Sequence, residues 1–429
     1  MILIVYTGTY REGSQQFAIV AENMAQEFFA NGKKVIKQEV NSKKELLQVF
    51  SMIEGENQSI DKFHFIGHSG MYGPMFGTVQ YPEQFSPFEI KNLSIPWSKN
   101  ARAFFHCCRS GRWFAPFFAL HQQVTTHGYH WYTSFSADKK YFRWPLLFGS
   151  KNLQVIGCIG RISHGLLGSL KKYSGFCPAE KFKVFVPENE TIDRDYNKVA
   201  KLYDAVFHDI KVRKDEWHWL RKHLPTTPGK VLDIGCGNGA LLKELAPEIV
   251  EGTGIDVSEK LLQKARKMTR DDRHIKFELV KGPFLPLDDH SYDLAISMLS
   301  FRYLDWDPLM QELKRVVKPE GKIIIVDMVT APVKWKEYPK LLRSKAQNYW
   351  QKYKQPAYYS ALAKLVSHPD WKRMLQYNPI RSQHEMVWYL QSRFPGRKVE
   401  VINVGLHARI LAFDSGPIKH LQQINLTYP

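Results

Sequence analysis

The stretch VLDIGCGNGALLKEL, residues 231–245, decides the fold of the second half of this chain of 429 residues. It starts as an apolar strand, turns at Gly235, Gly237 and Gly239, and continues with leucines at helical spacing. Glycines let the backbone turn tightly and approach a ligand, because no Cβ stands in the way. The helix that follows offers free N–H groups at its amino terminus. The stretch therefore predicts an α/β sheet with a nucleotide-type site after its first strand.

An acidic residue follows at the distance that such a site needs. Asp256 ends the next predicted strand, EGTGIDV (251–257), and lies 23 residues after Asp233 and 17 after Gly239. A carboxylate at that place can accept hydrogen bonds from both hydroxyls of a ribose. The alternative is a strand–turn–helix with a glycine for packing and a surface acid. The ligand site is favoured because strand, glycines, helix and acid all agree.

These residues resemble the class I S-adenosylmethionine-dependent methyltransferases, because they follow the pattern D-x-G-x-G-x-G rather than the G-x-G-x-x-G of dinucleotide enzymes. The resemblance continues in KGPFLPLDDHSYDLAIS (281–297) and in LKRVVKPEGKIIIVD (313–327). It covers about residues 195–330. It implies a methyltransferase that uses S-adenosylmethionine as its cofactor.

The resemblance also implies roles for individual residues. Asp256 would hold the ribose hydroxyls, Val257 would pack on the adenine, and Ser297 would lie near the reactive sulfonium. Arg302 and Tyr303 stand where many relatives carry a histidine, so they are candidates for the acceptor side. The implied cofactor residues are Asp233, Gly235, Cys236, Gly237, Gly239, Asp256, Val257 and Ser297, and the implied substrate residues are Tyr196, Tyr203, Arg302 and Tyr303.

The whole chain predicts an α/β protein with two Rossmann-like, three-layer α/β/α domains, because predicted strands and helices alternate throughout. We expect the first domain at residues 1–190 and the second at residues 191–429, separated by a polar stretch near residue 190. The second domain would have a class I methyltransferase fold. Its last part, 331–429, would be a basic helical insert followed by an antiparallel terminal hairpin, KVEVINVGLHARILAFDS (398–415).

Two predicted strands of the first domain end in reactive residues. KFHFIGHSG leads to His68 and ARAFFHCCRSG leads to Cys108, and neighbouring parallel strands end on the same edge of a sheet. A thiol beside a histidine can become a thiolate nucleophile. Together with CRSG (108–111), this pattern resembles the caspase-like fold of the clan CD cysteine peptidases over roughly residues 1–170. The resemblance implies His68 and Cys108 as a catalytic pair.

Three alternatives stay open for the first domain. IGHSGMYG (66–73) is close to the G-x-S-x-G elbow of serine hydrolases with Ser69 as nucleophile, although Met71 stands where the elbow needs a small residue. IVYTGTYREGSQQ (4–16) has the hydroxyl-rich loop of a flavodoxin-like domain. The third alternative is an inactive α/β scaffold in which the cysteine and histidine only pack.

Composition narrows the classes of protein further. Five cysteines, none in C-x-x-C spacing, favour free thiols in a reducing compartment over disulfides or a metal site. No apolar run reaches the length of a membrane helix, so we expect a cytoplasmic protein. The net charge is +18, and residues 331–429 hold 16 basic but only 5 acidic residues. Such an excess can attract an anionic molecule or nucleic acid.

We therefore expect a methyltransferase that acts on a small or medium-sized, possibly anionic, acceptor. One alternative is an RNA methyltransferase, because basic and aromatic residues interleave in KWKEYPKLLRSKAQNYWQKYKQPAYY (334–359). The other is a cysteine-peptidase-like hydrolase with His68 and Cys108, regulated by the methyltransferase domain. No metal is expected, and the sequence leaves the oligomeric state open.

Overall fold

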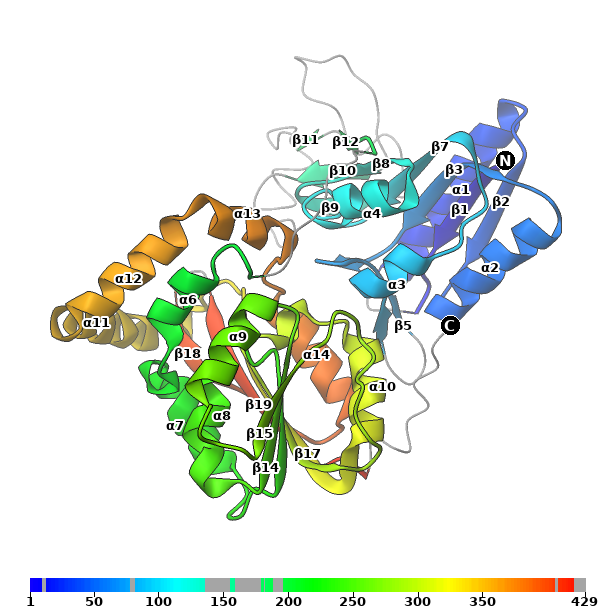
Figure 1. Ribbon diagram of the computed structural model, residues 1–429. Coiled ribbons are helices and arrows are strands. Elements are labelled where there is room, and N and C mark those ends of the chain that lie inside the picture. The colour runs from blue at the N-terminus through cyan, green and yellow to red at the C-terminus, as the bar shows by residue number, and fades with distance from the viewer. Residues whose placement is uncertain are drawn as a thin grey trace. The chain divides into compact units, whose positions relative to one another are not determined.

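The chain forms two compact units, residues 1–191 and residues 192–428, which we call unit 1 and unit 2 (Figure 1). Each has its own sheet with helices on both faces, which confirms the expected α/β class. The computed structural model describes residues 1–9, 13–77, 82–135, 155–158, 179–180, 182–187, 196–405 and 408–419.

Unit 1 is built on a sheet with the strand order β12-β8-β7-β3-β1-β2. All neighbours pair in parallel except β12 and β8, which are antiparallel. The sheet strands are β1 (Ile2–Tyr6), β2 (Val35–Glu39), β3 (Ile60–Ile66), β7 (Trp97–His106), β8 (Thr125–Gly128) and β12 (Lys183–Phe185); shorter strands are β4 (Ser69–Gly70), β5 (Gly73–Gly77), β6 (Pro82–Gln84), β9 (Tyr132–Phe135), β10 (Val155–Cys158) and β11 (Ala179–Glu180).

The helices of unit 1 cover both faces of this sheet because both faces carry apolar side chains. On one face Phe17 and Val20 of α1 pack with Ile2 and Ile4 of β1. On the other face Phe50, Phe63 and their neighbours form the apolar layer beneath three further helices. The helices are α1 (Ser14–Ala30), α2 (Lys43–Gly55), α3 (Pro87–Asn92) and α4 (Phe114–Gln122).

Unit 2 is built on a sheet with the strand order β15-β14-β13-β16-β17-β19-β18. The strands from β15 to β17 are parallel, and β19 is antiparallel to both β17 and β18. The expected terminal hairpin is therefore confirmed. The strands are β13 (Lys230–Ile234), β14 (Glu251–Asp256), β15 (Ile275–Leu279), β16 (Tyr292–Met298), β17 (Val317–Val329), β18 (Val399–Val404) and β19 (Arg409–Pro417).

The helical segment before the glycine loop, within residues 197–224, is broken into α6, η2 and α7. The break falls at Asp209, whose carboxylate accepts from the Lys211 N–H and starts a 3-10 turn instead of continuing the helix. The helices of unit 2 are α6 (Ala200–Phe207), η2 (Ile210–Val212), α7 (Lys214–His223), α8 (Ala240–Leu245), η3 (Ala246–Glu248), α9 (Glu259–Met268), η4 (Phe301–Tyr303), α10 (Trp306–Val316), η5 (Trp335–Glu337), α11 (Tyr338–Lys354), α12 (Pro356–Ser367), α13 (Pro369–Tyr377) and α14 (Gln383–Arg393).

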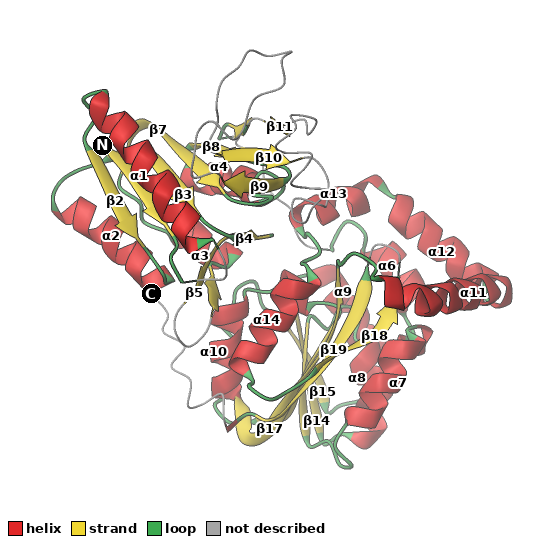
Figure 2. Cartoon of the chain, turned by 180° about the vertical axis from the view of Figure 1, so that it is seen from behind, coloured by secondary structure: helices red, strands yellow, loops and turns green. Residues whose placement is uncertain are grey.

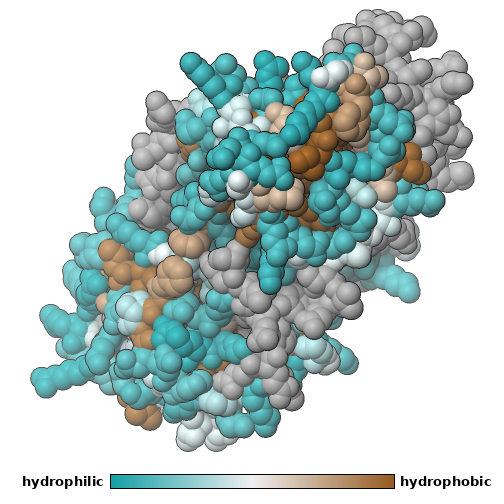
Figure 3. Space-filling model, turned by 90° about the vertical axis from the view of Figure 1, so that its right-hand side faces the viewer, coloured by the Kyte–Doolittle hydropathy of each residue, from teal (hydrophilic) through white to brown (hydrophobic). Residues whose placement is uncertain are grey.

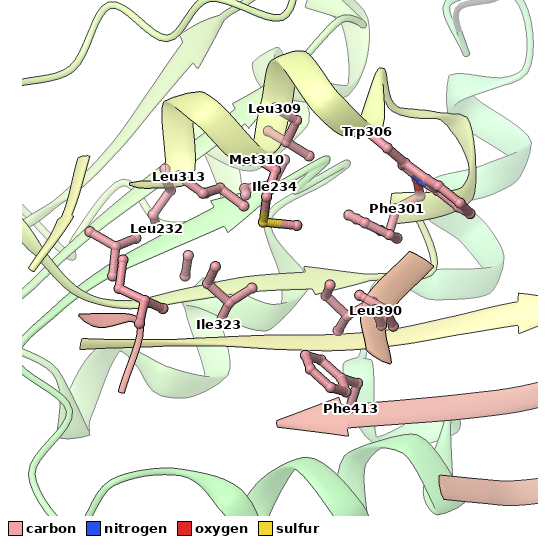
Figure 4. Packing of buried hydrophobic residues seen from close by; sticks show 14 of the residues in the cluster. Leu232, Ile234, Phe301, Trp306, Leu309, Met310, Leu313, Ile323, Leu390 and Phe413 are labelled. Carbon is pink, nitrogen blue, oxygen red and sulfur yellow. The ribbon is translucent and has the colours of Figure 1, made fainter. Parts of the chain in front are cut away.

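Two apolar layers enclose the unit 2 sheet. Figure 4 shows one of them, in which Met310 of α10 and Leu390 of α14 pack over Leu232 and Ile323 of the strands. Helices α7, α8 and α9 cover the other face. Figure 2 shows α10 and α14 on one side of this sheet and α7 and α8 on the other. In this sheet β13 is an interior strand between β14 and β16, so the loop after it lies away from both side edges of the sheet.

One face of the molecule is mostly polar where the structure describes it (Figure 3). On the face drawn in Figure 3, hydrophilic side chains predominate and hydrophobic ones gather in small patches. Among the helices that the structure describes, none combines the length and the apolar character needed to cross a bilayer.

Candidate functional site

The loop between β13 and α8 depends on three glycines with left-handed backbone conformations. Gly235, Gly237 and Gly239 have φ angles of +72°, +57° and +77°, which residues with a Cβ rarely adopt. A Cβ at Gly235 would lie 2.4 Å from the Cβ of Ser300, and one at Gly239 would lie 2.8 Å from that of Ala265. The loop therefore requires glycine for conformation and, at these two positions, also for space.

Two carboxylates flank this loop, as the sequence predicts. Asp256, at the end of β14, accepts from the Gly237 N–H at 2.9 Å and from the Ser258 N–H at 2.8 Å. Asp233 is only 2% exposed, and its Oδ2 atom has no hydrogen-bond partner among the described residues. Burial, together with the charge of Asp256, raises the pKa of Asp233 to about 8. An unpaired buried carboxylate is costly, so it marks a place where a cationic group would be stabilised.

Three other residues assigned to the cofactor differ in their surroundings. Val257 is 42% exposed, so an apolar side chain stands open beside Asp256. Cys236 is buried in the core, and burial raises the pKa of its thiol well above the usual value. Ser297 is 1% exposed, and its hydroxyl lies 2.7 Å from that of Ser300. Val257 is thus exposed, whereas Cys236 and Ser297 are buried.

The four residues assigned to the substrate lie close together beside the glycine loop. The rings of Tyr196 and Tyr203 are 5.4 Å apart, and a Cβ at Gly237 would lie 3.6 Å from the Tyr203 ring. Arg302 donates to the Tyr303 hydroxyl at 2.7 Å and also pairs with the buried Asp327. Desolvation raises the pKa of both Tyr196 and Tyr203, with Tyr303 contributing to each shift. The phenols are therefore neutral hydrogen-bonding groups at physiological pH.

The rings of Tyr196 and Tyr203 form what we call the aromatic cap over the glycine loop. Residues that were not predicted from the sequence hold this cap in place. Asn238, inside the glycine loop, donates to Asp204 at 3.0 Å and to the Phe207 carbonyl at 3.1 Å, which ties α6 to the loop. Arg213 donates to the Tyr203 hydroxyl at 3.3 Å. Ser300 donates to the Ile234 carbonyl at 2.6 Å and so fixes the turn after β16. The polar residue between two glycines at Asn238 was the available signal.

The carboxyl edge of the unit 1 sheet carries His68 and Cys108 after the adjacent strands β3 and β7. Sγ of Cys108 lies 3.3 Å from both the backbone N and the Oγ1 of Thr133. The ring of His68 meets Phe17 edge-on, with the ring centroids 5.1 Å apart. The Ser69 hydroxyl donates to the Cys108 carbonyl. The two predicted residues share an edge, and the roles assigned to them remain a prediction.

The glycine loop fits S-adenosylmethionine by the chemistry of its donors and acceptors. The unpaired Oδ2 atom of Asp233 suits a cationic amino group, and the Asp256 carboxylate suits a ribose diol. The exposed Val257 offers an apolar surface for an aromatic base. These residues would hold the cofactor, which supplies the methyl group when bound.

Comparison with known proteins leads to the same region. Residues 232–325 match the family described as "Methyltransferase domain". The demethylmenaquinone methyltransferase of Tropheryma whipplei (strain Twist) is 32% identical over 141 residues, which are 32% of this chain and 58% of that protein. The demethylmenaquinone methyltransferase of Thermotoga maritima is 31% identical over 144 residues, which are 32% of this chain and 61% of that protein. The chain thus spans about three fifths of the length of these curated relatives.

Among solved structures, an S-adenosylmethionine-dependent methyltransferase from Mesorhizobium loti is 31% identical, with a TM-score of 0.26, over 28% of this chain and 57% of that one. A SAM-dependent methyltransferase from Aquifex aeolicus is 19% identical, with a TM-score of 0.34, over 52% of this chain and 99% of that one. The family match covers β13 to β17, which carry the glycine loop and Asp256. Residues 232–325 therefore match a methyltransferase domain, and the residues around its glycine loop would hold S-adenosylmethionine.

Proposed function

We propose that the whole chain is a methyltransferase that transfers a methyl group from S-adenosylmethionine to a small or medium-sized acceptor. The observation that carries this proposal is the glycine loop closed by an aromatic cap. Tyr203 covers Gly237, and Asn238 hydrogen-bonds the loop to α6, so the chain itself covers the loop. A covered loop suits a compact acceptor more than a large polymer, because the aromatic cap occupies the space over the loop backbone.

The acceptor side of the proposal rests on Tyr196, Tyr203, Arg302 and Tyr303. Methyl transfer from a sulfonium is an in-line displacement, so the protein contributes mainly by holding the acceptor atom in line with the methyl group. Neutral phenols can donate hydrogen bonds to an acceptor oxygen and orient it. Arg302 keeps Tyr303 in place, because it donates to that hydroxyl while Asp327 fixes the guanidinium. The excess of basic residues in 331–429 favours an anionic acceptor.

Binding of S-adenosylmethionine and of its demethylated product, measured by titration calorimetry, tests the proposal. Asp256→Asn keeps the size of the side chain but removes its charge, and two weakened hydrogen bonds should lower affinity about tenfold to a hundredfold. Asp271→Asn is the matched control, because the Asp271 side chain is 85% exposed. Absence of binding by the unmodified protein would overturn the proposal. Equal affinities of the two variants would remove Asp256 from the site.

A second candidate function, a cysteine hydrolase in unit 1, is favoured by one contact. The Thr133 N–H lies 3.3 Å from the Cys108 sulfur, and a donor at that distance stabilises a thiolate. Hydrolysis of a library of fluorogenic peptides by the full chain tests this candidate. Cys108→Ala should abolish any hydrolysis, whereas Cys107→Ala, the neighbouring buried cysteine, should leave its rate unchanged. Hydrolysis that survives Cys108→Ala would contradict the candidate.

A further inference from the structure

Helix α11 and the turn before it carry an unusual set of exposed aromatic side chains. Trp335, Tyr349 and Tyr353 are 86%, 80% and 82% exposed, and Trp350 is 60% exposed. Large aromatic side chains are normally buried at least in part, so a cluster of exposed ones indicates a contact surface. Figure 1 shows α11 at the outer margin of unit 2, beyond α12.

The helical register places two of these side chains, Tyr349 and Tyr353, in one stripe along α11. Positions 338, 342, 345, 349, 352 and 353 follow one another at intervals of three, four or one, so they lie along one face of α11. Four of them are aromatic or aliphatic and two are lysines. We call this stripe the α11 face; it consists of Tyr338, Leu342, Lys345, Tyr349, Lys352 and Tyr353, all of them exposed.

The charge around the α11 face has a single sign. Within Tyr338–Lys354 the sequence holds five lysines and arginines and no acidic residue. A surface with this charge is complementary to an anionic partner and repels a second copy of itself. The α11 face is therefore unsuited to a symmetric dimer contact, in which like charges would meet.

The rest of unit 2 holds the helix firmly. Arg409 of β19, only 2% exposed, pairs with Glu337 at 2.6 Å and donates to the Pro332 carbonyl at 2.6 Å. Leu341, in the first turns of α11, is buried. Helix α12 packs on α6, the helix that bears Tyr203. The α11 face thus belongs to the same helical layer that covers the glycine loop.

We propose that the α11 face binds the surface of an anionic lipid bilayer. Helices that lie in the membrane interface combine an apolar or aromatic stripe with flanking lysines, and tyrosine and tryptophan favour the headgroup region. Each lysine near an anionic surface adds electrostatic attraction. Single-stranded RNA fits less well, because stacked bases need open ring faces. In this helix the Trp350 ring stacks near Tyr353 at 6.4 Å and carries Lys354 at 5.2 Å.

Co-sedimentation of the full chain with vesicles tests the proposal, and it requires neither cofactor nor methyl transfer. We expect binding to vesicles of phosphatidylcholine with phosphatidylglycerol, and much weaker binding to phosphatidylcholine alone. Added salt should weaken the binding by screening the charges. A failure of S-adenosylmethionine binding would leave this result untouched, so the two proposals can fail separately.

Two double variants separate the contributions of charge and of aromatic surface. Lys345→Gln with Lys352→Gln should weaken binding to anionic vesicles about tenfold or more. Tyr349→Ser with Tyr353→Ser should weaken it by a similar factor, because the interfacial aromatic area is lost. Their matched control removes two exposed lysines elsewhere in unit 2, by Lys222→Gln with Lys267→Gln, and should bind as the unmodified protein does.

Unchanged thermal unfolding of the variants shows that they fold. The proposal is overturned if the unmodified protein does not sediment with anionic vesicles, or if both α11 variants sediment as well as the control. A third combination of results would also overturn it: the protein binds polyuridylate, the tyrosine variant loses that binding, and the protein does not bind vesicles. The α11 face would then be an RNA-binding surface.

Discussion

The sheets of unit 1 and unit 2 differ in what shapes the loops at the carboxyl ends of their parallel strands. In unit 2 the edge is shaped by backbone, since three left-handed glycines make the turn and leave one oxygen of Asp233 unpaired. In unit 1 the edge is shaped by side chains, since Ser69 donates to the Cys108 carbonyl and Thr133 contacts the Cys108 sulfur. A glycine turn with an unpaired acid is prepared for a ligand. The described part of the unit 1 edge satisfies much of its polarity internally.

The buried titratable groups of the two units differ in the same way. Unit 1 buries imidazoles: His64 Nδ1 and His106 Nε2 lie 3.0 Å apart in the sheet. Unit 2 buries the acid Asp233 beside its loop. A buried base opposes protonation, and a buried acid opposes ionisation. The two units should therefore respond to pH in opposite directions, and the following changes can break or sharpen that contrast.

The largest effect is expected from Gly235→Ala in the unit 2 loop. The new Cβ would lie 2.4 Å from Ser300 and force a side chain into a φ of +72°. We expect unfolding of unit 2 to become easier by about 2–4 kcal/mol and cofactor binding to be lost. Gly282→Ala is the control, because a Cβ there meets no atom within 4 Å. Urea unfolding measures the loss of stability, and calorimetry measures the loss of cofactor binding. Equal stability of the two variants would show that the loop can relax.

The second largest effect that we expect is a loss of unit 1 stability at acid pH. Burial lowers the pKa of His106 to about 3, and burial, together with His106, lowers that of His64 well below 6.5. In the unfolded chain both imidazoles titrate near pH 6.5, so the unfolded state gains protons first as the pH falls. Stability should be full above about pH 6.5 and fall toward pH 3, by about 1.4 kcal/mol per pH unit for each imidazole.

Hydrogen exchange of β3 and β7 at pH 7 and pH 5, after correction for the intrinsic exchange rate, measures this loss locally. The double variant His64→Phe with His106→Phe should remove most of the pH dependence, because neither position can then be protonated. His208→Gln, at an exposed position of α6's carboxyl end, is the control. A unit 1 stability that is the same at both pH values would contradict the contrast.

In unit 2 we expect a smaller dependence of stability on pH, and of the opposite sign. The pKa of Asp233 is raised to about 8 by burial and by Asp256, while an unfolded aspartate titrates near pH 3.9. Between about pH 4 and pH 8 the folded state holds the extra proton, so stability should fall as the pH rises. A cationic ligand group beside Asp233 would favour its ionised form. Cofactor binding at pH 7 should therefore release protons, which calorimetry in buffers of different ionisation enthalpy detects.

Asp233→Asn should abolish this proton release and flatten the pH dependence of unit 2. Its expected loss of affinity is about tenfold, because one charge-assisted contact becomes neutral. Asp271→Asn is again the control, since it changes an exposed carboxylate. Release that persists in Asp233→Asn would assign the proton to another group.

Much of the unit 2 fold followed from sequence because local rules and tertiary structure agree there. The glycines, Asp256 and the terminal hairpin were predicted from spacing alone, and β13 and β14 lie where the pattern places them. The start of β17 could not be predicted from the sequence, because Val317 pairs with Tyr292 across a bulge that no local pattern reveals.

The parts that escaped prediction depend on contacts distant in sequence. The tie from Asn238 to α6 joins residues about thirty positions apart, and the buried pair of His64 and His106 joins two strands. Polar residues inside the apolar runs KFHFI and ARAFFH were the available signal for that pair. The α11 face was visible as composition, but only the helix register and the side chain exposures show that it is one stripe.

The smallest effect distinguishes the cysteines of the two edges. Burial raises the pKa of Cys107 to about 12 and that of Cys236 well above its usual value, whereas Cys108 is only partly buried. The thiolate is the form that attacks iodoacetamide, so in the folded protein Cys108 should be alkylated before Cys107 and Cys236. Peptide mass spectrometry over a time course measures the order, and in urea all three should react alike. Cys107 reacting as fast as Cys108 would show that the unit 1 edge opens in solution, and its side-chain closure would then be weaker than the glycine-built edge of unit 2.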